Sequence, residues 1–551
     1  MARRILIVGG VAGGMSAATR LRRLDEFAEI AIFERGPYVS FANCGLPYQL
    51  GGEIADKGKL IVQTPERLAA VFRLGVHARH EVIAVRPVAQ EIDVRDLATG
   101  QIRAEKYDDL ILSTGASPVV PNIPGIDRAG HFPLRTIPDL ERTDDWIRTK
   151  NAKTALILGG GFIGLETAEQ LHRRGLAVSV VEYGSQVLKP FDPEMAAIIH
   201  REIRKHGVSL RLGQSVVRFE AGDAAASIAV LADGTWLPAD LVIVGVGVKP
   251  EAKLAADAGL KIGPTGGIAV NESLRTSDPH VWAVGDAIEV THGVTGQPML
   301  IPLGGPANRQ GRTVADNICG RASRYESTIG TAIVRVFDQV AAVTGANETL
   351  LRKAGIPFEV VHLHPNSHAG YYPGAKPIAL KVLFAPGDGK ILGAQAVGED
   401  GVDKRIDVIA TAIKAGMTVH DLADLELCYA PPFGSAKDPV NLAGMAAQNV
   451  LAGDVTVAQW HEVPGLIASG AIVLDVRDAK ERDGGVIPGS LGIPLAQLRD
   501  RLGELPKDKL ILAHCASGQR SYNACRVLTQ HGFRCRNLAG SFKTWKAATE
   551  A

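Results

Sequence analysis

Residues 155–164 read Ala-Leu-Ile-Leu-Gly-Gly-Gly-Phe-Ile-Gly, and residues 5–14 read Ile-Leu-Ile-Val-Gly-Gly-Val-Ala-Gly-Gly. In both stretches an apolar run meets a glycine-rich turn, and a helical pattern follows, over Met15 to Leu24 and Leu165 to Arg174. The chain then returns to a β-branched segment that ends in an acid, at Glu34 and Glu182. This order is typical of a dinucleotide-binding βαβ unit. The sequence therefore predicts two such units.

The second unit has the complete glycine pattern. Gly159, Gly161 and Gly164 fit G-x-G-x-x-G, in which the glycines permit the tight turn, the approach of a pyrophosphate and close helix–strand packing. A carboxylate at Glu182 suits a ribose 2′-hydroxyl and repels a 2′-phosphate. We therefore expect NADH to be favoured over NADPH.

The first unit departs from this pattern. Gly9 and Gly14 hold the outer positions, but Val11 stands where the middle glycine is expected. Gly10 and Gly13 permit a shifted turn, and Glu34 supplies the ribose acid. We expect a dinucleotide site here as well.

Length and charge limit the class of protein. The chain has 551 residues, 46% of them hydrophobic and 22% charged, which predicts several soluble domains. A formal net charge of +1 gives no argument for nucleic acid or an anionic membrane as a partner. We expect a cytoplasmic chain, since it shows neither a signal peptide nor an apolar run of the roughly 18 residues that span a bilayer. A basic cluster of Arg20, Arg22 and Arg23 could still hold a phosphorylated small molecule.

The pattern of expected secondary structure changes near residue 330. Strands are expected at 331–337, 339–344, 358–362, 378–384 and 391–397, with a helix at 403–415. This pattern indicates an α+β region. Residues 446–456 are expected to form a linker, and the last 95 or so residues to form one small α/β domain.

Two further segments carry a family resemblance. Residues 276–286 end in Gly285 and Asp286 after a strand pattern, and residues 112–117 contain Thr114 and Gly115. Both resemble motifs of the two-dinucleotide-fold flavoproteins, in which that Asp bonds the ribityl chain of the flavin. The resemblance implies FAD at the first site and NAD(P)H at the second. It assigns cofactor binding to Gly9, Gly10, Ala12, Gly13, Gly14, Glu34, Arg35, Thr114, Gly115, Gly159, Gly161, Gly164, Glu182, Gly285 and Asp286.

A single cysteine follows the first unit. Residues 40–48 match S-F-x-x-C-G-x-P-Y around Cys44, which resembles the branch of coenzyme A disulfide reductases, persulfide reductases, and NADH oxidases and peroxidases. Two-cysteine members have a second cysteine five residues on, where this chain has Gln49. Cys44 must therefore cycle through a mixed disulfide, a persulfide or a sulfenic acid.

The same resemblance implies the substrate and a dimer. In coenzyme A disulfide reductases two tyrosines from the dimer partner lie near the cysteine, and Tyr371 and Tyr429 match them, with Tyr372 in reserve; simple interface packing is the alternative. Oxidases and peroxidases carry a histidine in the first helix, and residues 15–23 contain none. The residues that match a coenzyme A site are Ser16, Arg20, Arg23, Ser40, Asn43 and Lys437, although the two arginines could equally form a solvated helix face.

No metal site is expected. The six cysteines form no C-x-x-C pair, and no acid or cysteine near His362, His364 and His368 completes a ligand set.

The C-terminal domain has its own reactive cysteine. Cys515 follows a strand and opens a helix, and four residues separate it from Arg520, whereas phosphatases have five. This short loop resembles rhodanese, whose cysteine carries a sulfane sulfur, and residues 474–477 and 487–490 resemble further rhodanese motifs. Val486 stands where a histidine is common. Cys525 and Cys535 are expected to be passive thiols.

Together these patterns predict an α/β chain with four parts. They are an FAD part (1–115 and 245–325), an NAD(P)H part (116–244), a dimerisation domain (326–448) and a rhodanese domain (457–551). The expected activity is NAD(P)H-dependent reduction of coenzyme A disulfide, coenzyme A persulfide or polysulfide. A water-forming NADH oxidase and a redox- or sulfur-sensing module remain as alternatives.

Overall fold

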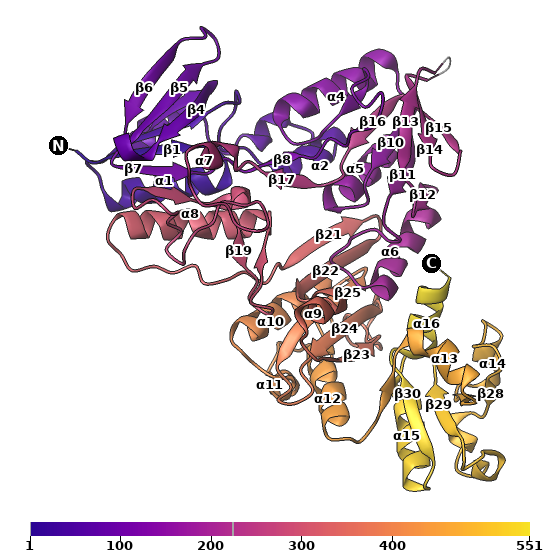
Figure 1. Cartoon of the computed structure of the whole chain (residues 1–551). Coiled ribbons are helices and arrows are strands. Elements are labelled where there is room, and N and C mark those ends of the chain that lie inside the picture. Colours follow the sequence, from indigo (N-terminus) through magenta and orange to yellow (C-terminus); the bar gives the residue numbers. More distant parts are fainter. Residues whose placement is uncertain (1, 223–224, 551) are drawn as a thin grey trace. The chain divides into compact units, whose positions relative to one another are not determined.

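The computed structural model describes residues 2–222 and 225–550, and the chain divides into two compact units (Figure 1). The first unit comprises Met1–Ser185 and Val208–Gly330. The second comprises Gln186–Gly207 and Thr331–Ala551. A segment of only 22 residues in the middle of the chain thus belongs to the second unit.

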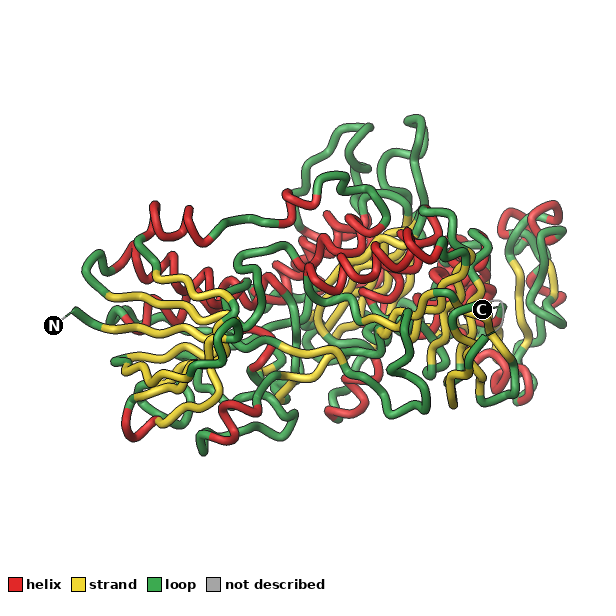
Figure 2. The backbone as a smooth tube through the Cα atoms, turned by 90° about the horizontal axis from the view of Figure 1, so that it is seen from above, coloured by secondary structure: helices red, strands yellow, loops and turns green. Residues whose placement is uncertain are grey.

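The first unit contains two parallel sheets. One has the order β18-β7-β1-β2-β3, and its strands near the N-terminus lie side by side in Figure 2. Its strands are almost continuously apolar because helices cover the sheet; Ile5, Leu6 and Ile7 are fully buried. The bounds are β1 (Arg4–Val8), β2 (Glu29–Glu34), β3 (Gly75–Ala78), β7 (Asp109–Leu112) and β18 (Val281–Ala283), with helices α1 (Ala12–Leu24) and α8 (Gly304–Ile318) packed together.

The second parallel sheet of this unit repeats the design, in the order β12-β11-β10-β16-β9. β1 pairs with β2 in the same parallel arrangement as β10 with β11. The two helices after the turns begin three residues earlier than predicted, because the helix starts directly at the glycine turn. The bounds are β9 (His131–Phe132), α4 (Ile137–Lys150), β10 (Thr154–Leu158), α5 (Phe162–Arg173), β11 (Ala177–Glu182), β12 (Ser209–Leu212) and β16 (Leu241–Val244).

The second unit begins with an antiparallel sheet in the order β21-β22-β25-β24-β23. The five strands and the following helix match their predicted bounds to within one residue. Helix α6 (Pro193–Lys205), from the middle of the chain, packs on this sheet. The bounds are β21 (Ala332–Val336), β22 (Gln339–Gly345), β23 (Glu359–Leu363), β24 (Ile378–Phe384), β25 (Ile391–Gly398) and α10 (Val402–Lys414).

A buried cation joins α6 to this sheet. The ammonium of Lys381 lies 2.8 Å from Asp192, 2.5 Å from Glu194 and 2.6 Å from Glu348. The three carboxylates compensate a charge that is expensive to bury. They also raise the pKa of Lys381 despite its burial.

The predicted linker at residues 446–456 is wrong over its first half. Helix α12 runs over Pro439–Leu451, so the connection to the last domain is only a few residues long. A capping box at Asp438 starts this helix, and Ala443 and Ala447 are fully buried. The apolar face of α12 is the reason that the helix extends.

The last domain is a parallel sheet in the order β26-β30-β29-β27-β28. Helix α16 (Ser541–Thr549) packs against α6 within the second unit. The remaining bounds are β26 (Val457–Ala458), β27 (Ile472–Asp475), α14 (Ala479–Arg482), β28 (Leu491–Gly492), β29 (Leu510–His514), α15 (Gln519–Gln530) and β30 (Arg534–Leu538).

The predicted α/β fold, with two βαβ units, an α+β region and a C-terminal α/β domain, is confirmed. Within the described residues, none of the helices combines the length and the apolar character that crossing a bilayer requires.

Candidate functional site

The two glycine turns have the same geometry. Gly9 has a φ of +99° and Gly159 a φ of +100°, a region that glycine adopts without strain. A Cβ on Gly14 would lie 2.0 Å from the Gly9 carbonyl oxygen, and one on Gly164 would lie 2.1 Å from that of Gly159. Each turn therefore needs its first and last glycine for a close approach of helix and strand.

The middle positions differ. Val11 precedes α1 and Gly161 precedes α5, each as the N-cap residue. A Cβ on Gly161 would meet no atom within 4 Å, so the space in front of α5 is open. Open backbone N–H groups at a helix N-terminus suit a phosphate. The valine therefore changes the surface of the first turn without changing its course.

The two acids occupy equivalent places. The Glu34 carboxylate accepts hydrogen bonds from the backbone N–H groups of Gly10 (2.9 Å) and Gly36 (2.7 Å). Glu182 does the same with Gly160 and Gly184, both at 2.7 Å. Each carboxylate thus stands at the end of its strand and against its glycine turn, where the ribose of a dinucleotide is expected.

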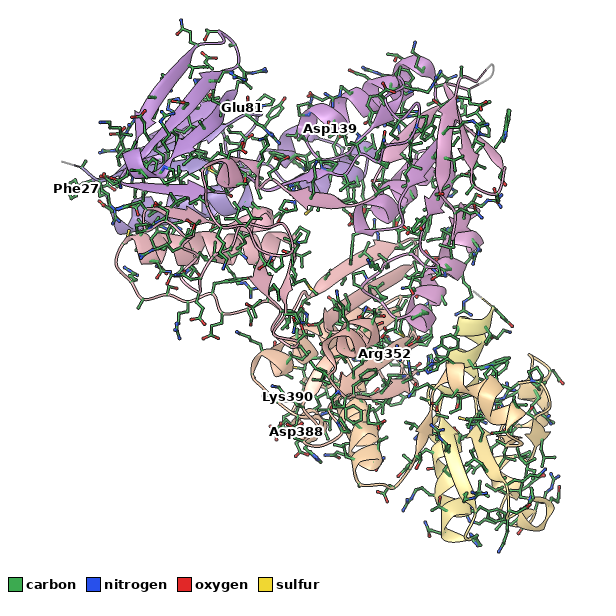
Figure 3. The ribbon with its side chains drawn as sticks, in the orientation of Figure 1. Phe27, Glu81, Asp139, Arg352, Asp388 and Lys390 are labelled. Atoms are coloured by element: carbon green, nitrogen blue, oxygen red, sulfur yellow. The ribbon has the colours of Figure 1, made fainter. Side chains whose placement is uncertain are left out.

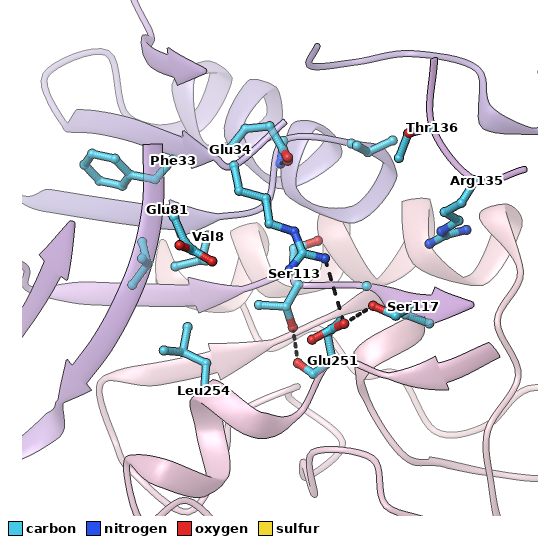
Figure 4. A pocket seen from close by; sticks show the side chains of 18 of the residues that line it. Val8, Phe33, Glu34, Glu81, Ser113, Ser117, Arg135, Thr136, Glu251 and Leu254 are labelled. Carbon is cyan, nitrogen blue, oxygen red and sulfur yellow. Dashed lines mark hydrogen bonds and ion pairs between the residues drawn. The ribbon is translucent and has the colours of Figure 1, made fainter. Parts of the chain in front are cut away.

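A cavity of 690 Å³ opens at the first turn (Figure 4). Its volume lies within the range of cofactor sites. Beside it, the Thr114 hydroxyl donates to the Glu251 carbonyl at 2.7 Å, and Arg35 lies 3.8 Å from the Glu251 carboxylate. Among the residues that line it are Gly9, Gly10, Val11, Glu34, Arg35, Asn43, Ser113, Thr114, Gly115, Arg135 and Glu251. Size and donor set fit the flavin dinucleotide that the sequence implies.

An arginine that the sequence motifs did not single out joins this cavity to Asp286. The Arg135 guanidinium lies 3.4 Å from the Asp286 carboxylate. Burial raises the pKa of Asp286, and Arg135 opposes that rise. Asp139, labelled in Figure 3, accepts the Arg135 backbone N–H at 3.1 Å and so fixes the start of α4.

Cys44 lies in a short 3-10 turn (Asn43–Gly45) and is exposed. Desolvation by the surrounding protein raises the pKa of its thiol, and the charges of Glu166 and Asp286 raise it further. Arg135 lowers this pKa. Asn43, the residue before Cys44, lines the cavity together with Arg135, so Cys44 lies next to the cavity.

Glu166 was also missed by sequence reasoning. The Tyr48 hydroxyl donates to its carboxylate at 2.8 Å, which connects the helix after Cys44, α2 (Leu46–Leu50), to α5. The signal was available, since Glu166 follows Gly164 by two residues and Tyr48 belongs to the cysteine motif. The sequence did not show that the two residues meet.

The expected coenzyme A residues on α1 have differing surroundings. Arg20 forms an ion pair with Asp316 at 2.7 Å, and its side chain is only 14% exposed. Arg23 is exposed. Including Arg22 in a ligand-binding cluster was wrong, because its guanidinium is buried and donates to backbone carbonyls such as that of Ala28 at 2.8 Å.

Two further members of that set, Ser16 and Ser40, hold local structure, and a third, Asn43, lines the cavity. The Ser16 hydroxyl donates to the Asn308 carbonyl at 2.9 Å. Ser40 has a φ of +47°, and its N–H donates to the Gly10 carbonyl at 2.7 Å. Asn43 precedes Cys44 and lines the cavity.

The two tyrosines predicted to act together do meet. The hydroxyls of Tyr371 and Tyr429 lie 3.1 Å apart, and the side chains are 76% and 50% exposed. Tyr372 and Phe433 are also exposed nearby in sequence. A surface with this many exposed aromatic residues is typical of a protein interface. Lys437 is exposed and lines a cavity of 340 Å³ together with Gly518 and Gln519 of the last domain.

Cys515 directly follows β29 and is almost fully buried, with 1% of its surface exposed. Its Sγ accepts hydrogen bonds from the Gly518 N–H at 3.1 Å and the Ser521 hydroxyl at 3.5 Å. Burial opposes ionisation, but the hydrogen bonds from Ser521, Ser517 and Gly518 outweigh it and lower the pKa of the Cys515 thiol. The loop thus stabilises a thiolate.

Charged residues surround this loop. Arg520 makes two hydrogen bonds of 2.6 Å to Glu481 on α14, which raise the pKa of Arg520. Asp475 and Arg477 form a buried pair at 2.7 Å beside His514. Burial lowers the pKa of His514 to about 4.

Comparison with known proteins gives three matching family models. The pyridine nucleotide-disulphide oxidoreductase model matches residues 3–306, its dimerisation domain matches residues 331–439, and the rhodanese-like domain matches residues 460–548.

Individual proteins match over most of the chain. The coenzyme A disulfide reductase of Staphylococcus epidermidis is 35% identical over 446 residues, 81% of this chain and all of that protein. The structure of reduced Bacillus anthracis CoADR-RHD is similar with a TM-score of 0.98 and 48% identity, over 100% of this chain and 99% of that one. An NAD-dependent persulfide reductase from A. fulgidus is similar with a TM-score of 0.92 and 37% identity, over 98% of this chain and 100% of that one.

Proposed function

The chain belongs to the pyridine nucleotide-disulphide oxidoreductase family, and we propose that it reduces coenzyme A disulfide, coenzyme A persulfide or polysulfide with NAD(P)H through Cys44. Its rhodanese domain handles sulfane sulfur at Cys515. The observation that carries the proposal is the place of Cys44, which directly follows Asn43, a residue that lines the dinucleotide cavity, and whose sulfur is under the influence of Arg135, which lines the same cavity.

The cofactor assignment follows from the two turns. FAD belongs in the 690 Å³ cavity and against Asp286, and NAD(P)H belongs at Gly159, Gly161 and Gly164. The Glu182 carboxylate favours NADH, because it would repel a 2′-phosphate. When bound, these cofactors supply the electron pair by hydride transfer.

Cys44 performs the sulfur chemistry. Its thiolate attacks one sulfur of a disulfide RSSR, forms the mixed disulfide Cys44–S–SR and releases RS⁻. Two electrons and a proton then cleave that bond, which releases RSH and restores the thiolate. With a persulfide RSSH, attack at the inner sulfur releases hydrosulfide. Cys44 forms no disulfide within its own motif, because residue 49, where two-cysteine members have the second thiol, is Gln49.

We assign the substrate site to residues of two subunits. Ser16, Arg20, Arg23, Ser40 and Asn43 would contact coenzyme A, with Arg23 the arginine that is open to solvent. In a homodimer, Tyr371 and Tyr429 of the second subunit would donate a proton or a hydrogen bond to the departing thiolate, and Lys437 would bind a phosphate. The matching dimerisation domain and the exposed aromatic surface support this arrangement.

The rhodanese assignment rests on the loop after β29. Its hydrogen bonds lower the pKa of Cys515, and Arg520 adds a positive charge near the sulfur. Cys515 would accept or deliver a sulfane sulfur. These roles are consistent with the four parts proposed from the sequence. They are the FAD part in 1–115 and 245–325, the NAD(P)H part in 116–244, the dimerisation domain in 326–448 and the rhodanese domain in 457–551.

An anaerobic substrate panel tests the proposal. NADH oxidation would be followed with coenzyme A disulfide, coenzyme A persulfide and polysulfide, in the wild-type chain and in Cys44→Ala and Cys515→Ala. We expect turnover that requires Cys44 and survives Cys515→Ala. Aerobic NADH consumption without a sulfur substrate is the control; equal or faster turnover with oxygen would instead make the chain an NADH oxidase. Turnover that survives Cys44→Ala would remove the assignment.

A further inference from the structure

Two cysteines of the C-terminal domain lie in contact. The sulfur atoms of Cys525, in α15, and Cys535, in β30, are 2.8 Å apart, although ten positions separate them in sequence. A disulfide has a sulfur–sulfur distance of about 2.05 Å, so bond formation needs a movement of less than about 1 Å. The sequence, from which we expected passive thiols at both positions, gave no sign of this contact.

The backbone holds both cysteines in place. β30 pairs with β29 in parallel, with Cys535 opposite Ile511. Cys525 faces the same layer, where it packs with Ala513 of β29 and with Val455. A sheet on one side and a helix of 12 residues on the other therefore fix the distance between the two Cβ atoms.

The two thiols differ in access. Cys525 is 1% exposed, whereas Cys535 is only partly buried. Burial, together with its bond to Cys535, raises the pKa of the Cys525 thiol well above its usual value. Because it is the more exposed of the two, Cys535 is the thiol that a reagent in solution reaches first; Cys525, whose sulfur lies 2.8 Å from that of Cys535, is the group placed to react with it afterwards.

We propose that Cys525 and Cys535 are a redox modification site that forms a reversible disulfide with low-molecular-weight disulfides as the oxidant. The Cys535 thiolate attacks RSSR and releases RS⁻, which forms Cys535–S–SR. Cys525 then attacks the Cys535 sulfur, loses its proton, and releases the second RS⁻. The two protein thiols lose two electrons and two protons, and RSSR gains them as two RSH.

The bond has a consequence for Cys515. The catalytic loop joins β29 to α15, and α15 carries Ser521, whose hydroxyl contacts the Cys515 sulfur. The disulfide fastens α15 to β30, the neighbour of β29. Since Cys515 is 1% exposed, a reagent reaches its sulfur only when the loop opens. The oxidised pair restrains this opening and slows reactions of Cys515.

The experiment uses the full chain without NADH, so that Cys44 does not turn over. The reduced protein is incubated with hydroxyethyl disulfide, the remaining thiols are blocked, and the tryptic peptides are analysed by mass spectrometry. Trypsin separates the two cysteines into residues 521–526 and 535–536. We expect these peptides joined by a disulfide, absent after treatment with dithiothreitol and absent in Cys535→Ser and Cys525→Ser. Cys319→Ser, at a partly buried cysteine of the other unit, is the matched control and should leave the joined peptide unchanged.

Two outcomes would overturn the proposal. A stable mixed disulfide at Cys535 without the joined peptide would show that Cys525 does not resolve it. Iodoacetamide labelling of Cys515 should be roughly threefold or more slower in the oxidised wild type than in the reduced protein, and unchanged in Cys535→Ser; equal rates in both wild-type forms would remove the link to the catalytic loop. NADH-dependent turnover of the reduced chain is a separate measurement, so a failure here leaves the proposed function untouched.

Discussion

Cys44 and Cys515 differ both in exposure and in the direction of their thiol pKa shifts. Cys44 is exposed, yet its pKa is raised; Cys515 is almost fully buried, yet its pKa is lowered. Around Cys44 desolvation by the surrounding protein opposes ionisation, and the acids Glu166 and Asp286 add to it, whereas around Cys515 hydrogen bonds to the sulfur from Ser521, Ser517 and Gly518 outweigh desolvation. Hydrogen-bond donors that point at a sulfur can therefore offset the effect of burial and stabilise its thiolate, as they do at Cys515.

The largest expected effect comes from replacing each of the two cysteines and measuring the reductase and sulfur-transfer activities separately. Cys44→Ser should reduce anaerobic NADH-dependent reduction of coenzyme A disulfide by about three orders of magnitude or more, because the attacking sulfur is lost. Cys515→Ser should leave this rate within about twofold of the wild type and abolish sulfur transfer from thiosulfate. Loss of reductase activity in both variants would show that the sites form one pathway and do not act separately.

Acid should strongly destabilise the C-terminal domain around the buried Cys515. The pKa of His514 is lowered from 6.5 to about 4, so the unfolded state binds the proton more readily than the folded state. The stability from this group is complete above pH 6.5 and falls as the pH drops towards 4, by about 3 kcal/mol in total. Hydrogen exchange of the β29 amides measures this loss. His514→Gln should flatten the dependence, while His531→Gln, at an exposed histidine of the same domain, should not.

A smaller effect is expected when one hydrogen-bond donor to the Cys515 sulfur is removed. Ser521→Ala removes the side-chain hydrogen bond to Cys515 and should raise its pKa, which lowers the rate of alkylation at neutral pH by roughly tenfold. The pH dependence of iodoacetamide labelling gives this value. Ser517→Ala is the matched control, since Ser517 acts through its backbone N–H, which the substitution retains. Equal effects of both substitutions would contradict the role of the hydroxyl.

The smallest expected change concerns the acids near Cys44. Glu166→Gln should lower the pKa of Cys44, and Arg135→Gln should raise it, so their alkylation rates at neutral pH should move in opposite directions by about two- to fivefold. Tyr48→Phe keeps the Glu166 charge and should shift the pKa less than Glu166→Gln does. Shifts of the same sign in the two charge variants would rule out an electrostatic origin.

Much of the fold and part of the site could be predicted because their signals are local. The glycine spacing required the two turns, and the strand-like and helical segments of residues 331–414 were located to within one residue. The identification with single-cysteine reductases that carry a rhodanese domain is confirmed by the matching families and relatives. The linker was wrongly predicted over 446–451 because the apolar residues there identify a helix only when the surface on which they pack is known.

The sequence by itself determined the two glycine turns, the acids that follow them, and the loop from Cys515 to Arg520, because each depends on a few residues that are adjacent in the chain. Only the tertiary structure decided that Arg135 and Glu166 act on Cys44, and that Cys525 touches Cys535. These contacts join residues from different strands and helices. Packing sets such distances, and no spacing along the chain encodes them.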